Sequence, residues 1–148
     1  MNTLLVSQAS EIIKSEDKLS AMCNTTALLM QSINRINWVG FYLFKGDKLI
    51  LGPFQGKVAC SEIEVGKGVC GTSYQKRMLL NVADVSRFEG HIACDPDSKS
   101  ELVVPLMFDG KLLGVLDCDS PELNRFSSEE ESTFEEIAKL ITQKLLQK

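Results

Sequence analysis

Three cysteines in the middle of the chain, Cys60, Cys70 and Cys94, are the residues best suited to chemistry. They are spaced ten and twenty-four residues apart, and Cys94 follows His91, the only histidine, by three positions. In a reducing compartment such cysteines are buried small side chains, metal ligands or redox-active thiols. A zinc site formed by these cysteines with His91 would lack the closely spaced cysteine pairs of structural zinc sites, so we expect no metal. We favour a redox site, in which His91 orients the loop or lowers the pKa of Cys94.

Three carboxylates, Glu101, Asp117 and Asp119, lie in otherwise apolar segments. Because side chains two residues apart share one face of a strand, Asp117 and Asp119 point the same way and Cys118 points the opposite way. Burial of carboxylates is costly unless they are paired or satisfied by a ligand, so the cluster indicates a pocket for a cation or a proton-rich ligand. The alternative is that all three acids lie at the solvated edge of a sheet.

The composition limits the classes of function. A net charge of −4 and a pI near 5.1 over 148 residues do not favour a nucleic-acid surface. Apolar runs are far shorter than the ~18 residues of a membrane-spanning helix, and residues 1–13 lack the basic leader of a signal peptide. We therefore expect a single cytoplasmic domain over residues 1–148 that binds neither nucleic acid nor membrane.

The N-terminal part of the chain predicts two helices followed by a hairpin. Both helices are expected within residues 3–34, and Cys23 lies on the apolar stripe of the second as a buried small side chain. Residues 38–44 indicate a strand, and its return strand is expected to end at Gly52-Pro53. Trp38 and Tyr42 share a face of the first strand, where Gly40 between them would leave room for a ligand.

The remaining elements complete an α+β fold: a central, mostly antiparallel sheet flanked by the N-terminal helices and a C-terminal helix. The two strands around Asp109-Gly110 are apolar on both faces, which indicates a sheet covered on each side. From residue 62 onwards we expect a strand at 62–65, a helix at 66–78, a strand at 79–82, a long functional loop at 83–99, strands at 101–108 and 111–119, and a final helix capped by Ser127.

Six ordered blocks of the sequence resemble the free methionine-(R)-sulfoxide reductases, which are single GAF domains. The blocks are WVGFY at 38–42, LGPFQG at 51–56, GKGVCGT at 66–72, GHIACD at 90–95, SELVVP at 100–105 and GVLDCDSP at 114–121. Together they span nearly the whole chain. One departure is Cys118, where an aliphatic residue is more usual; strand alternation turns it away from the pocket.

The resemblance implies a role for each candidate residue. Cys94 would attack the sulfoxide sulfur, Cys60 would resolve the sulfenic acid as a disulfide, and Cys70 would be an alternative or auxiliary partner. Glu101, Asp117 and Asp119 would hold the polar parts of the substrate, while Trp38 and Tyr42 would accommodate its methyl end. No cofactor would be bound; thioredoxin, with NADPH and thioredoxin reductase, would be the external reductant. GAF domains often pair through their helices, so a homodimer is a further expectation.

The implied reaction agrees with the chemistry of the residues. A sulfoxide oxygen is a poor leaving group until it is protonated, and crowding of the three carboxylates raises the pKa of at least one of them, which could then act as the acid. Another carboxylate can bind the ammonium of a free amino acid. The same acids would raise the pKa of Cys94 until substrate neutralises them. The competing hypothesis is a non-catalytic GAF module that binds a ligand or senses redox state, although 148 residues leave no room for an output domain.

Overall fold

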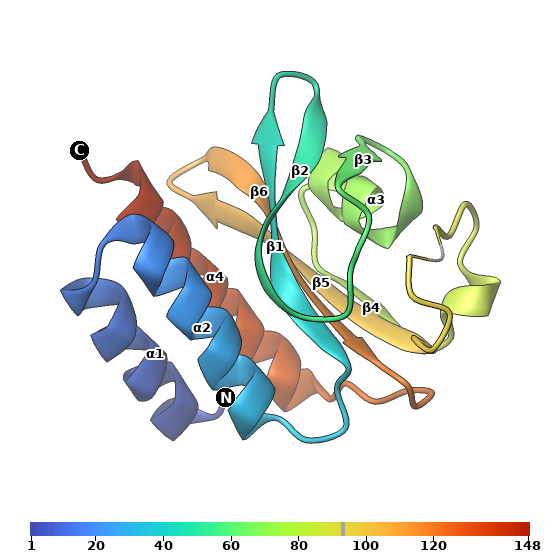
Figure 1. Cartoon of the computed structure of the whole chain (residues 1–148), viewed down its shortest axis with the longest axis horizontal. Coiled ribbons are helices and arrows are strands. Elements are labelled where there is room, and N and C mark those ends of the chain that lie inside the picture. The colour runs from blue at the N-terminus through green and yellow to red at the C-terminus, as the bar shows by residue number, and fades with distance from the viewer. Residues whose placement is uncertain (93) are drawn as a thin grey trace.

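A computed structural model describes residues 1–92 and 94–148 of the chain and shows the long helices gathered on one face of a curved sheet and a short helix on the other (Figure 1). Ala93, which belongs to the expected loop and to the GHIACD block, lies outside the described residues. The elements run in the order α1 (Thr3–Ser15), α2 (Lys18–Ser32), β1 (Trp38–Lys45), β2 (Lys48–Gly56), β3 (Glu62–Glu64), α3 (Gly68–Lys76), β4 (Leu80–Val82), the 3₁₀ turn η1 (Val85–Arg87), β5 (Ser100–Phe108), β6 (Lys111–Ser120) and α4 (Ser128–Leu146).

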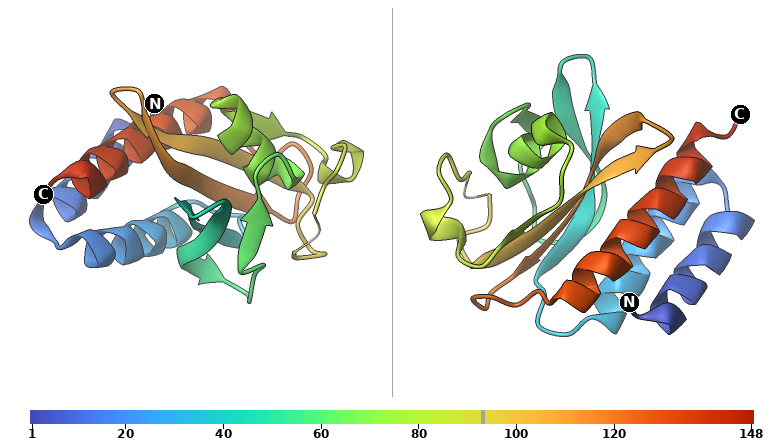
Figure 2. Two further views of the ribbon diagram at one scale, coloured as in Figure 1. Left: turned by 90° about the horizontal axis from the view of Figure 1, so that it is seen from above. Right: turned by 180° about the vertical axis from the view of Figure 1, so that it is seen from behind.

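The sheet has six strands in the order β3-β2-β1-β6-β5-β4, and every neighbouring pair is antiparallel. Helices α2 and α4 pack directly on one face, and α1 packs outside them (Figure 2). Helix α3 covers the other face. The predicted α+β fold, with its sheet covered on both sides, is therefore confirmed. The helices that the structure describes are all too short or too polar to cross a lipid bilayer.

Local sequence signals set where the long helices begin and where the last hairpin turns. The Asn2 and Asp17 side chains accept from backbone amides in the first turns of α1 and α2. Ser127 and Glu130 cap α4 reciprocally in a capping box. Asp109 and Gly110 both have positive φ, as a two-residue turn between twisted strands requires.

The prediction that β2 ends at Gly52-Pro53 is wrong, because the strand continues to Gly56. Gly40 pairs with Phe54 but Tyr42 pairs with Leu51, so Gly52 and Pro53 together lie opposite Phe41 in a β-bulge. A bulge leaves a residue outside the ladder, and the missing N–H of proline is tolerated there.

The placement of Cys23 was also predicted wrongly, because this side chain is exposed. Helix α2 buries Met22, Thr25, Thr26 and Leu29, which follow helical spacing along one face. Met22 and Leu29 lie on the buried face, as the apolar stripe predicts, but this face continues through the two threonines, which the sequence pattern counted as polar, and Cys23 lies outside it.

Candidate active site

A cavity of about 50 Å³ lies on the face of the sheet opposite α2 and α4. Its floor is formed by side chains of β1, β5 and β6, and its walls by the start of α3, the segment between β2 and β3, and the loop between η1 and β5. All eight residues predicted for the site belong to this region: seven line the cavity, and Cys60 is bonded to one of the seven. The seven are Trp38, Tyr42, Cys70, Cys94, Glu101, Asp117 and Asp119.

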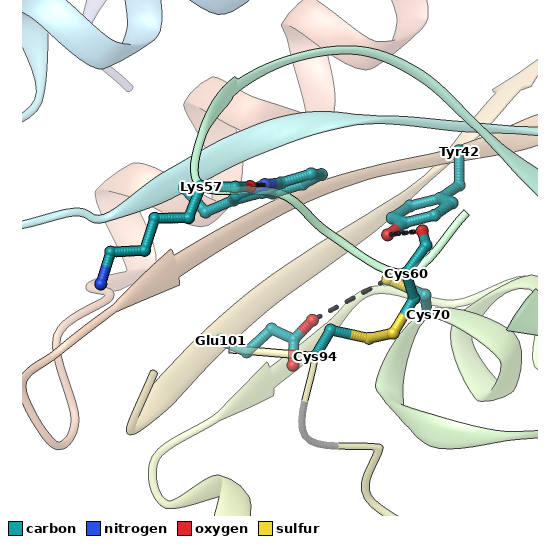
Figure 3. Close-up of a disulfide and its surroundings, with 7 residues drawn as sticks. Tyr42, Lys57, Cys60, Cys70, Cys94 and Glu101 are labelled. Carbon is teal, nitrogen blue, oxygen red and sulfur yellow. Dashed lines mark hydrogen bonds between the residues drawn. A yellow bond between two sulfur atoms is a disulfide. The ribbon is translucent and has the colours of Figure 1, made fainter. Parts of the chain in front are cut away.

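Cys60 and Cys94 form a disulfide at the wall of the cavity (Figure 3). Their Cα atoms are 5.6 Å apart, although the residues are separated by 34 positions in the sequence. Both residues are half-buried, so the bond is partly accessible. The Tyr42 hydroxyl donates to the Cys60 carbonyl at 2.9 Å and so ties this segment to β1. Burial and the charge of Asp117 raise the pKa of Tyr42, which keeps the phenol protonated as a donor.

The disulfide form of the chain is incompatible with the Cys₃His zinc site considered from the sequence. Two of the three sulfur ligands of that site, those of Cys60 and Cys94, are bonded to each other. His91 is half-buried in the cavity wall. Its proposed influence on the Cys94 thiol stays a prediction.

Cys70 is the third cysteine of the cavity, and its thiol is not part of the disulfide. It lies in the first turn of α3, where Gly71 lets the helix approach β3: a Cβ at position 71 would collide with the carbonyl oxygen of Glu64. Its Sγ donates to Glu101 Oε2 across 3.8 Å (Figure 3). Burial, followed by the charges of Glu101 and Asp119, raises the pKa of Cys70 well above its ordinary value.

The three carboxylates come from adjacent strands and meet at one end of the sheet. Glu101 of β5 lies directly opposite Asp119 of β6, and Asp117 lies two residues along the same face. The alternative of a solvated edge is wrong for Glu101 and Asp117, which are only 8% and 5% exposed. One oxygen of Asp117 and one of Asp119 are buried without a hydrogen-bond partner among the described residues. These oxygens mark a place for a ligand that carries protons or positive charge.

Burial dominates the electrostatics of the two aspartates. It raises the pKa of Asp117 well above the ordinary range, and the charges of Asp119, Cys70 and Glu101 add to the effect. The pKa of Asp119 rises for the same first reason, with the charge of Glu101 as the next cause. Burial and mutual repulsion therefore favour the protonated form of the two aspartates, because adjacent charges are costly to hold together out of water.

The aromatic wall differs from the expectation in one respect. Trp38 stacks between Tyr42 and Phe54, with ring centroids 5.9 and 5.3 Å apart respectively. The space above Gly40 is filled by the Trp38 ring and the Phe54 side chain, so no ligand approaches there. Gly40 instead leaves room for the stacked rings. Phe54, which supports Trp38, was not predicted as a site residue, because the predicted β2 ended before it. The Trp38 indole donates to the Lys57 carbonyl at 3.2 Å.

Polar contacts hold the disulfide-bearing loop in place and were not predicted from the sequence. The Asn37 side chain donates to Asp95 and to Ser98, each at 3.1 Å, and Lys57 pairs with Asp97 at 3.0 Å. Asn37 directly precedes β1. Its position next to the aromatic residues of this strand is the one feature of the sequence that could have identified it as part of the site. The loop is thereby held by the residue that precedes β1 and by the residue that follows β2.

Residues 18–145 match the GAF domain, and the chain therefore belongs to the GAF-domain family. A free methionine-R-sulfoxide reductase of Escherichia coli (strain K12) is 48% identical over 119 residues, which cover 80% of this chain and 72% of that protein. The structure of fRMsr of Staphylococcus aureus in complex with substrate superimposes with a TM-score of 0.90 at 49% identity, covering 97% of this chain and 94% of that one.

A second substrate complex, of free methionine-R-sulfoxide reductase from Neisseria meningitidis, has a TM-score of 0.91 at 39% identity and covers 95% of this chain and 85% of that one. The resemblance to free methionine-(R)-sulfoxide reductases inferred from the six sequence blocks is thus confirmed, as is the GAF fold.

Proposed function

We propose that this chain reduces free L-methionine-(R)-sulfoxide to methionine, with Cys94 as the nucleophile and Cys60 as the resolving thiol. The observation that carries the proposal is a partly accessible Cys60–Cys94 bond beside buried carboxylate oxygens that lack partners. The similarity to named reductases supports the class of substrate. The chain works as a single GAF domain, in the cytoplasm, where an NADPH-driven thioredoxin system supplies the electrons.

The first step transfers oxygen from the substrate to the enzyme. The Cys94 thiolate attacks the sulfoxide sulfur while a carboxyl protonates the sulfoxide oxygen, which gives an adduct with a bond between the two sulfurs. The oxygen then passes to the Cys94 sulfur, and the S–O bond of the substrate and the bond between the two sulfurs both break. Cys94 is oxidised by two electrons to a sulfenic acid, and the substrate sulfur is reduced by two electrons and leaves as methionine. We assign the proton to Asp117, because it is the most deeply buried carboxyl and its pKa is raised well above the ordinary range.

The second step closes the disulfide. The Cys60 thiolate attacks the Cys94 sulfenic acid, the S–S bond forms, and the oxygen leaves as water. The dithiol of thioredoxin then reduces the bond and is itself oxidised, to be regenerated by thioredoxin reductase and NADPH. The Asn37 and Lys57 contacts hold the loop over the site and keep the bond half-buried. Full access of thioredoxin to the bond therefore requires these contacts to open. Cys70 serves as an auxiliary thiol, since its Sγ faces Glu101 in the same cavity.

Selectivity for the free amino acid follows from charge. Glu101 and Asp119 bind the ammonium group, which a methionine inside a polypeptide lacks. Trp38 contacts the methyl end, and its ring is held by Tyr42 and Phe54. Tests of this assignment therefore need both free and blocked substrates.

The deciding experiment is NADPH oxidation coupled through thioredoxin and its reductase, with four substrates in parallel: free methionine-R-sulfoxide, the free S epimer, and each epimer in a blocked form. Turnover confined to the free R epimer is expected. Turnover of the blocked R epimer at a similar rate would contradict ammonium recognition by the acidic cluster. No turnover of any substrate, with the thiols shown to be reduced, would favour a ligand-binding module instead.

A further inference from the structure

Cys70 and the carboxylates have a geometry that the reductase reaction does not require. A ligand atom from each of Cys70, Glu101 and Asp117 can be chosen so that all three lie within 4.8 Å of one another. The side chains are buried and come from α3, β5 and β6, three elements whose relative positions the sheet and its covering helix determine. None of these atoms is used by the Cys60–Cys94 bond, so the group persists in the disulfide form.

A second observation independently indicates a cationic ligand at this place. Asp117 is 5% exposed, lines the cavity, and has a buried Oδ1 with no hydrogen-bond partner among the described residues. Within residues 1–92 and 94–148, the ion pairs formed by Lys and Arg do not include Glu101, Asp117 or Asp119. Lys67 is exposed at the cavity wall and leaves these charges uncompensated.

We propose that the disulfide form of the chain binds a borderline divalent cation, zinc(II), through Cys70 Sγ, Glu101 and Asp117. Zinc sites that exchange ligands contain three protein ligands and one open position. In a tetrahedral zinc site a sulfur and an oxygen ligand are about 3.6 Å apart, as the usual Zn–S and Zn–O bond lengths require. The observed separation of Cys70 Sγ and Glu101 Oε2 is 3.8 Å. The soft sulfur disfavours magnesium and calcium.

Binding requires no redox step. The cation displaces the proton of the Cys70 thiol and the proton held by Asp117, and both pass to solvent. The resulting thiolate and the two carboxylates then coordinate the metal. Asp119, whose Oδ1 also lacks a partner, faces the same cavity and would hold a water on the open position. The site differs from the Cys₃His set considered from the sequence, because it uses one cysteine and two strand carboxylates.

One consequence depends on the proposed function. The metal and the substrate ammonium would both need Glu101, and the metal would also occupy Asp117, the proposed proton donor, so zinc would inhibit turnover in competition with methionine sulfoxide. Metal binding to the disulfide form can be measured directly and does not depend on enzymatic activity. The proposal is therefore tested by binding and not by inhibition.

The test uses the full chain with the Cys60–Cys94 bond formed and verified by mass spectrometry. Cadmium(II), which reports thiolate ligation by an ultraviolet charge-transfer band, is titrated in chelator-free buffer, and zinc(II) is followed by calorimetry. One ion per chain is expected, with the charge-transfer band. Cys70→Ser should abolish the band and weaken zinc binding by more than about tenfold, an effect at least as large as the loss of a supporting ligand contact.

Two further variants make the result decisive. Cys23→Ser removes an exposed thiol away from the cavity and should leave binding unchanged. Glu101→Gln keeps the shape of the side chain and should weaken zinc binding while the charge-transfer band persists at higher metal concentration. Absence of the band in the folded parent chain, binding retained in Cys70→Ser, or binding lost in Cys23→Ser would each overturn the proposal, whether or not the chain is a reductase.

Discussion

The two faces of the sheet are built from the same strands but have opposite properties. On the face under α2 and α4, the core is mainly apolar and includes Phe41, Leu116 and Phe134, all fully buried, together with Cys118 and buried threonines of the two helices. On the other face, β5 and β6 place three carboxylates beside a disulfide and a buried thiol. Alternation along one strand separates the two environments, because Leu116 and Asp117 are consecutive residues. Burial of apolar side chains on the first face stabilises the fold. This stabilisation offsets the free-energy cost of burying the carboxylates on the second face.

The two buried cysteines make the contrast specific. Cys70 and Cys118 both carry thiols whose pKa is raised, first of all by burial. Cys118 lies within the apolar core, whereas the Cys70 sulfur faces Glu101. Burial alone therefore does not identify a functional cysteine; the groups that face its sulfur do.

The largest expected effect comes from removing the attacking sulfur on the cavity face. Cys94→Ser should reduce turnover of free methionine-R-sulfoxide by at least about a thousandfold, because no other group replaces the nucleophile. Substrate binding, measured by calorimetry, should persist. The control is Cys23→Ser, which removes an exposed thiol and should behave like the parent chain. Substantial turnover in Cys94→Ser would remove Cys94 from its proposed role.

The next effect concerns the helix-side core. Phe134→Ala should lower the free energy of unfolding by about 3–5 kcal/mol, because Phe134 is completely buried between α4 and the sheet and its loss leaves a cavity. Urea denaturation measures this change. The folded fraction at low temperature should retain the KM of the parent chain. A raised KM with unchanged stability would mean that the two faces are not separable.

Asp117→Asn should have opposite effects on the two properties. Turnover should fall strongly, since the proposed proton donor is lost. The metal-free protein at pH 7 should gain about 1–3 kcal/mol of stability, because a neutral amide avoids the free-energy cost of burying a carboxyl that is ionised in the unfolded chain. The pKa of Asp117 is raised in the folded state, so its stability contribution is present below the unfolded pKa of about 3.9 and is lost as the pH rises towards the folded pKa.

The variant should therefore show a smaller decline of stability as the pH rises from about 4 towards neutral. Thermal denaturation of both proteins across this range, with a chelator present, measures the difference. An Asp117→Asn protein that is less stable than the parent at pH 7 would show that the carboxylate is satisfied in the folded state.

The smallest effect is expected for Cys118→Val, on the same strand but on the opposite face from Asp117. The two side chains have similar volume and Cys118 is completely buried in apolar surroundings, so stability should change by less than about 1.5 kcal/mol. The kinetic constants should not change. A marked loss of turnover would connect the helix-side core to the reaction and break the comparison between the faces.

Local signals in the sequence are sufficient to predict much of the fold and which residues form the site. Capping residues, the Asp109-Gly110 turn and the alternation along β6 are local signals, and they act over a few residues without help from the rest of the chain. They correctly predicted the last helix, the last hairpin, and the opposite directions of Asp117 and Cys118. Local patterns failed where tertiary packing decided the outcome: the bulge that carries β2 past Pro53, and the buried threonines that turn Cys23 outwards.

The arrangement of the site was decided by the tertiary structure alone. Spacing along the chain cannot show that Cys60 and Cys94, 34 residues apart, meet while Cys70 instead faces Glu101. Nor can it show that Phe54 fills the space above Gly40. These are contacts between distant segments, and the sheet register and the packing of α3 determine them. The residue types made the chemistry available, and the antiparallel pairing of β5 with β6 brought the acids together out of water, where their charges matter most.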